Sequence, residues 1–333
     1  MIWLTWRQFR TQAAVVYGAI AVFAVALAAT GPRLAHQYRT RGNDFLREIS
    51  GTCTGLYVAG VLAVLALPFI IGLFWGAPLV TRELDAGTHR LAWTQTTRTR
   101  WLVTKLGLTG LAAMAAAGLL SLAVTWWAGP IDEAIGNVTG MPGPGLLIFP
   151  RLSPEIFDAR GLVPVGHAAL AFVLGVTIGV IVRRTLPAMA IVLAVFAVVQ
   201  VTMSVGVRPH LVAPEHLTTT VTNANLMNLN MFNNLTVTID KPGAWVISQH
   251  TVNAAGHPAP VPSWMLSCPP GSGSGPASRE CLARFTRLGY RQQVTYQPAG
   301  RFWALQLYET VIYLVLAGLL GGLCTWWIRH RLS

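Results

Sequence analysis

Three polar side chains at helical spacing interrupt a long apolar stretch near the end of the chain. Gln306, Glu309 and Tyr313 fall at positions i, i+3 and i+7, so they share one face of a helix. An acid within such a stretch is costly to bury and marks a functional position by default. Glu309 lies about seven residues into the stretch, roughly 10 Å from its start at 1.5 Å per residue. These residues are candidates for a gate or pathway lining; the alternative is a structural contact that bonds or neutralises Glu309.

A second concentration of polar residues, 81–100, separates two apolar runs. It reads TRELDAGTHRLAWTQTTRTR, and six of its twenty residues are charged, although only 11% of the whole chain is charged. We expect Thr81 to cap a short helix whose first turn is stabilised by acids, and Gly87 to end it in a left-handed conformation. The candidate functional residues of this segment are Glu83, Asp85, Gly87, Thr88, Arg98 and Arg100. The alternative is a solvated loop whose arginines only set topology.

The four cysteines suggest one disulfide and no metal site. No two of them form a CxxC pair, which argues against zinc and thioredoxin-like chemistry. Cys268 and Cys281 fall in one polar region. In an oxidising compartment they would close a loop of about 14 residues and stabilise the fold by up to ~3 kcal/mol. The alternative is two unpaired thiols.

Composition places all of these residues in a membrane protein. The chain has 333 residues, 53% of them hydrophobic, and a mean hydropathy of +0.52, whereas a soluble domain has about 25% charged residues. A bilayer core of ~30 Å is crossed by ~20 apolar residues in a helix. Six runs fit this length: 13–30, 56–80, 102–127, 163–182, 186–205 and 302–327. The net charge of +12 does not indicate nucleic-acid binding, because the basic residues flank apolar runs.

The placement of lysine and arginine favours cytosolic N- and C-termini, although the arginines of the first outer loop run against this rule. The predicted fold class is an all-α polytopic membrane protein with six transmembrane helices. Its parts are an interfacial amphipathic helix (1–12), helices 1–5 (13–205) with a cytosolic coupling loop (81–101), a mixed α/β extracytoplasmic domain (206–301), and helix 6 with a cytosolic tail (302–333). Residues 1–12 alternatively extend the first span.

The polar region between the fifth and sixth runs is long enough to carry structure of its own. Residues 235–240, 244–252 and 292–296 are expected to be extended. Residues 278–289 are expected to form a short helix, with Ser278 as its N-cap and Gly289 as its stop.

Together these features resemble the membrane subunit, or permease, of a type-2 ABC exporter. In that class a coupling helix with a Glu, a Gly-Thr pair and a later Arg before a Lys joins spans two and three. Here the matching residues are Glu83, Gly87–Thr88, Arg98 or Arg100, and Lys105. The tail YQPAGRFWALQLYETVIYL is similar to that of actinobacterial permeases. The resemblance implies a loop that docks on a cytosolic ABC ATPase, a second permease copy (identical or related), and efflux across a bacterial cell membrane.

The sequence carries no motif for ATP hydrolysis or other catalysis. A Walker A loop needs a lysine after a glycine-rich run, whereas the only lysines are Lys105, in WLVTK, and Lys241, which precedes Pro242. HExxH and GxSxG are also absent. We therefore predict no catalytic residue, cofactor or metal on this chain, and ATP with magnesium on the partner ATPase. A membrane enzyme is disfavoured by the same absences. The other alternative is a membrane sensor or regulatory subunit that binds a ligand through its outer domain.

Overall fold

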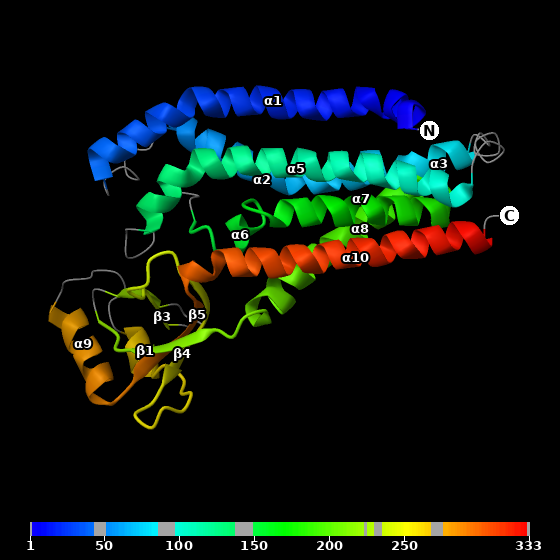
Figure 1. The fold of residues 1–333 in the computed structure, drawn as a ribbon. Coiled ribbons are helices and arrows are strands. Elements are labelled where there is room, and N and C mark those ends of the chain that lie inside the picture. Colours follow the sequence, from blue (N-terminus) through cyan, green and yellow to red (C-terminus); the bar gives the residue numbers. More distant parts are fainter. Residues whose placement is uncertain are drawn as a thin grey trace. The chain divides into compact units, whose positions relative to one another are not determined.

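The structure is a computed structural model that describes residues 2–42, 51–85, 97–136, 149–222, 225–229, 235–267 and 276–331 (Figure 1). The chain folds into two compact units. The larger unit comprises Met1–Ile131, Pro154–Leu211 and Trp303–Ser333, and the smaller comprises Asp132–Ser153 and Val212–Phe302. The larger unit is helical, and the smaller unit contains the β-strands.

Within the described residues, six helices are long and apolar enough to cross a membrane, and they correspond to the six predicted runs. They are α1 (Ile2–Arg41), α2 (Gly51–Ile70), α5 (Arg98–Gly136), α7 (Val163–Val182), α8 (Thr185–Thr202) and α10 (Phe302–Arg331). Helix α2 continues through the π-helix η2 (Ile71–Gly76) into α3 (Ala77–Asp85). Helix α8 continues through the π-helix η3 (Met203–Val207) into the 3-10 helix η4 (Arg208–His210), and the short α6 (Pro154–Phe157) precedes α7.

The start of the chain is part of the first long helix. Residues 1–12 were expected to form a separate interfacial helix, but α1 runs without a break from Ile2 to Arg41, as the alternative prediction has it. No glycine or proline precedes Gly18, so nothing in the sequence interrupts the helix there. Trp3 and Trp6 are exposed, whereas Phe9 is buried edge-on against Trp75, with ring centroids 4.6 Å apart.

The long helices run roughly parallel to one another (Figure 1). The two marked chain ends and α3 lie at one end of this bundle, and α6 lies at the opposite end (Figure 1). The bundle therefore has two distinct ends. One carries the predicted coupling segment, and the other carries the start of α7 and the start of α10.

Glycines bring the second and fourth spans into backbone contact. A Cβ atom on Gly175 would lie 2.4 Å from the carbonyl oxygen of Gly72, and one on Gly179 would lie 2.7 Å from that of Ala77. Real side chains do not tolerate such distances, so only glycine permits this packing. Helix α7 is thus packed directly against η2 and α3.

The smaller unit contains two antiparallel sheets. One has the strand order β1-β5-β4, and the other pairs β2 with β3. The strands are β1 (Glu215–Thr219), β2 (Leu226–Leu229), β3 (Leu235–Val237), β4 (Trp245–Val252) and β5 (Arg291–Gln297). The predicted extended stretches contain β3 and β4, the third stretch lies within β5, and β1 and β2 come in addition to the prediction.

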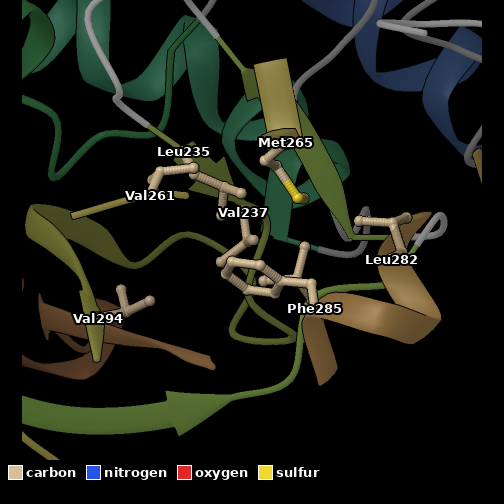
Figure 2. Close-up of a cluster of buried hydrophobic side chains, with 8 residues drawn as sticks. Leu235, Val237, Val261, Met265, Leu282, Phe285 and Val294 are labelled. Atoms are coloured by element: carbon tan, nitrogen blue, oxygen red, sulfur yellow. The ribbon is translucent and has the colours of Figure 1, made fainter. Parts of the chain in front are cut away.

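Helix α9 (Pro276–Arg287) completes the core of the smaller unit. Its Leu282 and Phe285 belong to a buried apolar cluster with residues of β3 and β5, among them Val237 and Val294 (Figure 2). The helix begins at Pro276, a residue suited to a first turn, so Ser278 is not its N-cap. Gly289 follows the helix with φ +81°, which confirms the predicted stop.

Cys281, in α9, is disulfide-bonded. Its predicted partner, Cys268, lies outside the described residues, so the pairing itself stays a prediction.

Candidate functional site

Arg208, in η4 at the end of span five, is the centre of a buried charged cluster. Its Nε donates to Oε2 of Glu309 at 2.8 Å, and its Nη2 donates to Oε1 of the same carboxylate at 2.9 Å. Nη2 also donates to Oδ1 of Asp158, which follows α6. The Arg208 and Glu309 side chains are 1% and 0% exposed, and Asp158 is 12% exposed. Two carboxylates therefore share one guanidinium in a site largely removed from water.

Neighbouring side chains hold the guanidinium in place. Its central carbon lies 4.3 Å from the centroid of the Phe157 ring, within the range of a cation–π attraction. Its Nη1 donates to Oγ of Ser204 at 3.4 Å, one helical turn earlier. The orientation that pairs Arg208 with both carboxylates is thus fixed from several sides.

A chain of hydrogen bonds beside the cluster joins spans four, five and six. The Tyr313 hydroxyl donates to Oε1 of Gln200 at 2.9 Å, so the amide nitrogen of Gln200 donates to Nδ1 of His167 at 3.1 Å. This network assigns the His167 proton to Nε2 in a neutral ring. Among the described residues, Nε2 is buried without a hydrogen-bond partner. The His167 ring packs edge-on against Tyr313, with centroids 4.5 Å apart.

Gln306 ties the start of span four to span six. Its Oε1 accepts the backbone N–H groups of Leu162 and Val163 at 2.8 and 2.9 Å, and its Nε2 donates to the carbonyl oxygen of Phe157 at 3.0 Å. The first N–H groups of a helix have no partner within the helix. Gln306, which lies on span six, supplies the missing hydrogen-bond acceptor. Gly161, with φ +67°, permits the approach, because a Cβ there would lie 2.8 Å from Oε1.

The predicted face of span six is therefore a face of contacts. Gln306, Glu309 and Tyr313 are all buried, and each bonds a different partner. These contacts are of the kind expected from the structural alternative, and a role as a gate or pathway stays a prediction. Sequence reasoning missed three of the partners: Asp158, Gln200 and Arg208.

The spacing of Asp158, His167 and Glu309 resembles that of a metal site. One donor atom from each of Asp158, His167 and Glu309 lies within 4.8 Å of the other two. Arg208, however, donates to both carboxylates. A metal ion would have to displace this positive charge, so we assign the cluster as an ion-pair network.

At the other end of the bundle, the predicted coupling segment is described in part. Glu83 and Asp85 lie in the last turn of α3, while Gly87 and Thr88 lie outside the described residues. The expected cap is wrong, because Thr81 lies inside α3. Its hydroxyl donates to the carbonyl oxygen of Ala77 at 2.9 Å and lies 3.0 Å from Oγ1 of Thr185. Span two continues as helix to Asp85, the last residue described before the gap, so Glu83 and Asp85 do not lie at a helix start.

The far side of the segment opens the third span as predicted. Arg98 is the first residue of α5, and the exposed Arg100 donates its backbone N–H to Oγ1 of Thr97 at 3.4 Å. Lys105 is buried one turn further on, with Nζ 4.8 Å from the centroid of the Trp101 ring. A buried cation close to the polar segment is consistent with a site that contacts charged groups.

A family model described as "ABC-2 membrane transporter related" matches residues 17–208, more than half of the chain. The chain belongs to this family. It is the membrane subunit of a type-2 ABC transporter, as the resemblance predicts. No curated protein and no solved structure matches the chain.

The match places both sites in the context of an ABC-2 membrane transporter. It includes the segment between α3 and α5, and it ends at Arg208. Glu309, which pairs with Arg208, lies beyond the matched residues. The charged cluster thus joins the matched part of the transporter to its last span.

Proposed function

We propose that this chain is the permease subunit of an ATP-driven ABC exporter and forms the membrane pathway. Membership in the ABC-2 family carries the proposal. The six apolar helices supply the membrane part. Because the sequence contains no Walker A lysine, ATP and magnesium are bound by a separate cytosolic ABC ATPase.

The ATPase drives the permease through residues 81–101. The contacts of α3 support this route: Thr81 bonds Thr185 at the start of α8, and Ala77 lies against Gly179 of α7. A displacement of α3 is therefore passed directly to spans four and five. Such transmission needs packed elements that move together, and backbone contact through glycine provides it.

The complete transporter contains two permeases and resides in the bacterial cell membrane with both termini cytosolic. The second permease is another copy of this chain or a related one. A bundle whose apolar helices leave many large side chains exposed, such as Leu186 and Val198 of α8, has surface for both lipid and a second subunit.

Co-expression with candidate ABC ATPases from the same genome tests the proposal. Replacing Glu83 and Asp85 together by lysine should cut permease-stimulated ATP hydrolysis about tenfold or more, within the 5–150-fold range of typical couplings. The control is Glu280→Lys, an exposed acid of α9 in the smaller unit. Equal stimulation of ATP hydrolysis by the double lysine variant and by the Glu280→Lys control would reject the coupling route. Absence of any complex with an ABC ATPase would reject the exporter.

A cavity in the smaller unit favours a sensor as the second candidate. It has a volume of about 300 Å³ and is lined by Leu235, Gln249, His250, Thr251, Pro258, Ala259, Pro260, Val261 and Gln292. A mixed apolar and polar lining suits a small ligand. Ala259→Trp would fill this cavity. In cells, this variant should leave efflux intact if the chain is an exporter and abolish the response to the ligand if the chain is a sensor.

A further inference from the structure

The charged cluster carries one more negative charge than positive. Arg208 and Glu309 form a two-bond pair that is neutral in itself, and Asp158 adds a second carboxylate to the same guanidinium. Groups this deep in a protein rarely keep an uncompensated charge. We propose that the cluster is a proton-binding site and that the Asp158 carboxyl takes up the proton.

The two carboxylates are not equivalent. Both oxygens of Glu309 accept hydrogen bonds from Arg208, and the side chain is fully buried. Asp158 is bonded by Arg208 through Oδ1, and its side chain is 12% exposed. Asp158 also lies outside the six candidate spans. A proton therefore reaches Asp158 over a shorter path and binds there without breaking the paired hydrogen bonds of Glu309.

Among the described residues, Arg208 is the cation that forms an ion pair with Asp158. The titratable and charged groups that face it are Arg208 of η4, Glu309 and Tyr313 of α10, and His167 of α7. His167 is neutral, because its Nδ1 accepts from Gln200. On the segment of Asp158 itself, Glu155 is exposed, and Arg160 donates to the carbonyl oxygen of Val124 at 3.0 Å.

The electrostatics of Asp158 agree with this geometry. The pKa of its carboxyl is raised to about 7 in all, because burial raises it more than the Arg208 guanidinium lowers it and the Glu309 carboxylate also raises it. The folded chain therefore binds this proton more tightly than the unfolded chain, whose Asp158 has an ordinary pKa. The stability that comes from the bound proton is present in acid and is lost as the pH rises toward 7.

Protonation changes how the segment after α6 is held. A neutral Asp158 keeps at most a single hydrogen bond to Arg208 in place of an ion pair, while Arg208 stays bonded to Glu309. Gln306 still holds Phe157 and the start of α7. Proton binding thus loosens one contact between this segment and η4 and leaves the other contacts of the site in place.

Infrared titration of the purified full-length chain in lipid nanodiscs tests the site. With carbon-13-labelled aspartate, the stretching band of a protonated aspartic acid should disappear with a midpoint near pH 7 and should be absent from Asp158→Asn. In Glu309→Gln, Arg208 pairs with Asp158 alone. The midpoint should then fall by about one to three pH units, the shift typical of an aspartate beside an arginine.

Glu215→Gln is the matched control, because Glu215 pairs with Arg301 at 3.1 Å in the smaller unit and is half-exposed. It should titrate like the natural chain. If Asp158→Asn does not fold, the direction of the Glu309→Gln shift decides the question. A band that survives in Asp158→Asn, no titrating aspartic acid between pH 5 and 8, or an unmoved midpoint in Glu309→Gln would overturn the proposal. The measurement needs no ATPase, so its failure is distinct from that of the exporter proposal.

Discussion

At the scale of the residue, Gln306 shows how one side chain can hold an entire helix end. Its amide satisfies two N–H groups at the start of α7 and one carbonyl group of the preceding segment. All of these groups come from a part of the chain more than 140 residues away. No apolar side chain can replace this contact, because a hydrocarbon offers neither a hydrogen-bond acceptor nor a donor.

Gln306→Leu should therefore lower the thermal stability of the detergent-purified chain strongly. A buried backbone group that loses its partner costs about 1–3 kcal/mol. This change removes the acceptor of the Leu162 and Val163 N–H groups, whereas the Phe157 carbonyl oxygen keeps the N–H of Arg160 at 3.3 Å. The matched control is Leu307→Ala on the exposed face of the same helix. A transition midpoint for Gln306→Leu no lower than that of the control would show that the backbone groups find other partners.

The sequence indicated only half of this site. Spacing alone put Gln306, Glu309 and Tyr313 on one helical face, because helical periodicity is a local property. Arg208 follows an apolar run directly and so looks like any arginine that flanks a span. Asp158 lies in a Pro-containing outer segment. Their pairing depends on tertiary contacts across 50 and 101 residues, which local patterns do not encode.

At the scale of the element, the long helices and the strands β3, β4 and β5 could be predicted, whereas β1 and β2 could not. A span is specified by apolar length alone, and the six predicted runs match the six long helices. The strands β1, EHLTT, and β2, LMNL, lack the alternation that marks a half-buried strand. The helix break that we expected after residue 12 is absent from α1. An amphipathic helix and an apolar span have the same helical period, so the sequence pattern does not mark a boundary between them.

The glycine contact between η2 and α7 gives a prediction at this scale. Gly175→Ala places a Cβ 2.4 Å from a backbone oxygen, and backbone cannot swing aside. Overpacking of this kind costs about 1–3 kcal/mol. Gly318→Ala is the control, because a Cβ there meets no atom of the described residues within 4 Å.

Melting of the two variants side by side checks this prediction. Gly318→Ala should match or slightly exceed the natural chain, since alanine favours a helix over glycine. Equal midpoints for both variants would mean that spans two and four separate easily.

At the scale of the whole molecule, the prediction of cytosolic termini depends on the distribution of charge. The arginines in the last turns of α1 oppose the rule that favours cytosolic basic residues. The candidate span of α1 has 33 residues, and a helix of that length reaches about 50 Å, well beyond an apolar core of ~30 Å. These arginines can therefore lie outside the apolar layer, where their charge is tolerated.

The coupling proposal requires that the segment before α5 face the cytosol. We expect a cysteine introduced by Thr97→Cys to react with a membrane-impermeant maleimide only after the cells are permeabilised. A cysteine introduced by Ala255→Cys, in an exposed turn of the smaller unit, should react in intact cells.

The natural chain, with its own four cysteines, gives the background. Among the described residues, three candidate spans, α5, α7 and α8, separate the two positions in the sequence, so we expect the two cysteines to be labelled from opposite sides of the membrane. Reversed labelling would place residues 81–101 away from any cytosolic ATPase and remove the route by which ATP hydrolysis reaches the bundle.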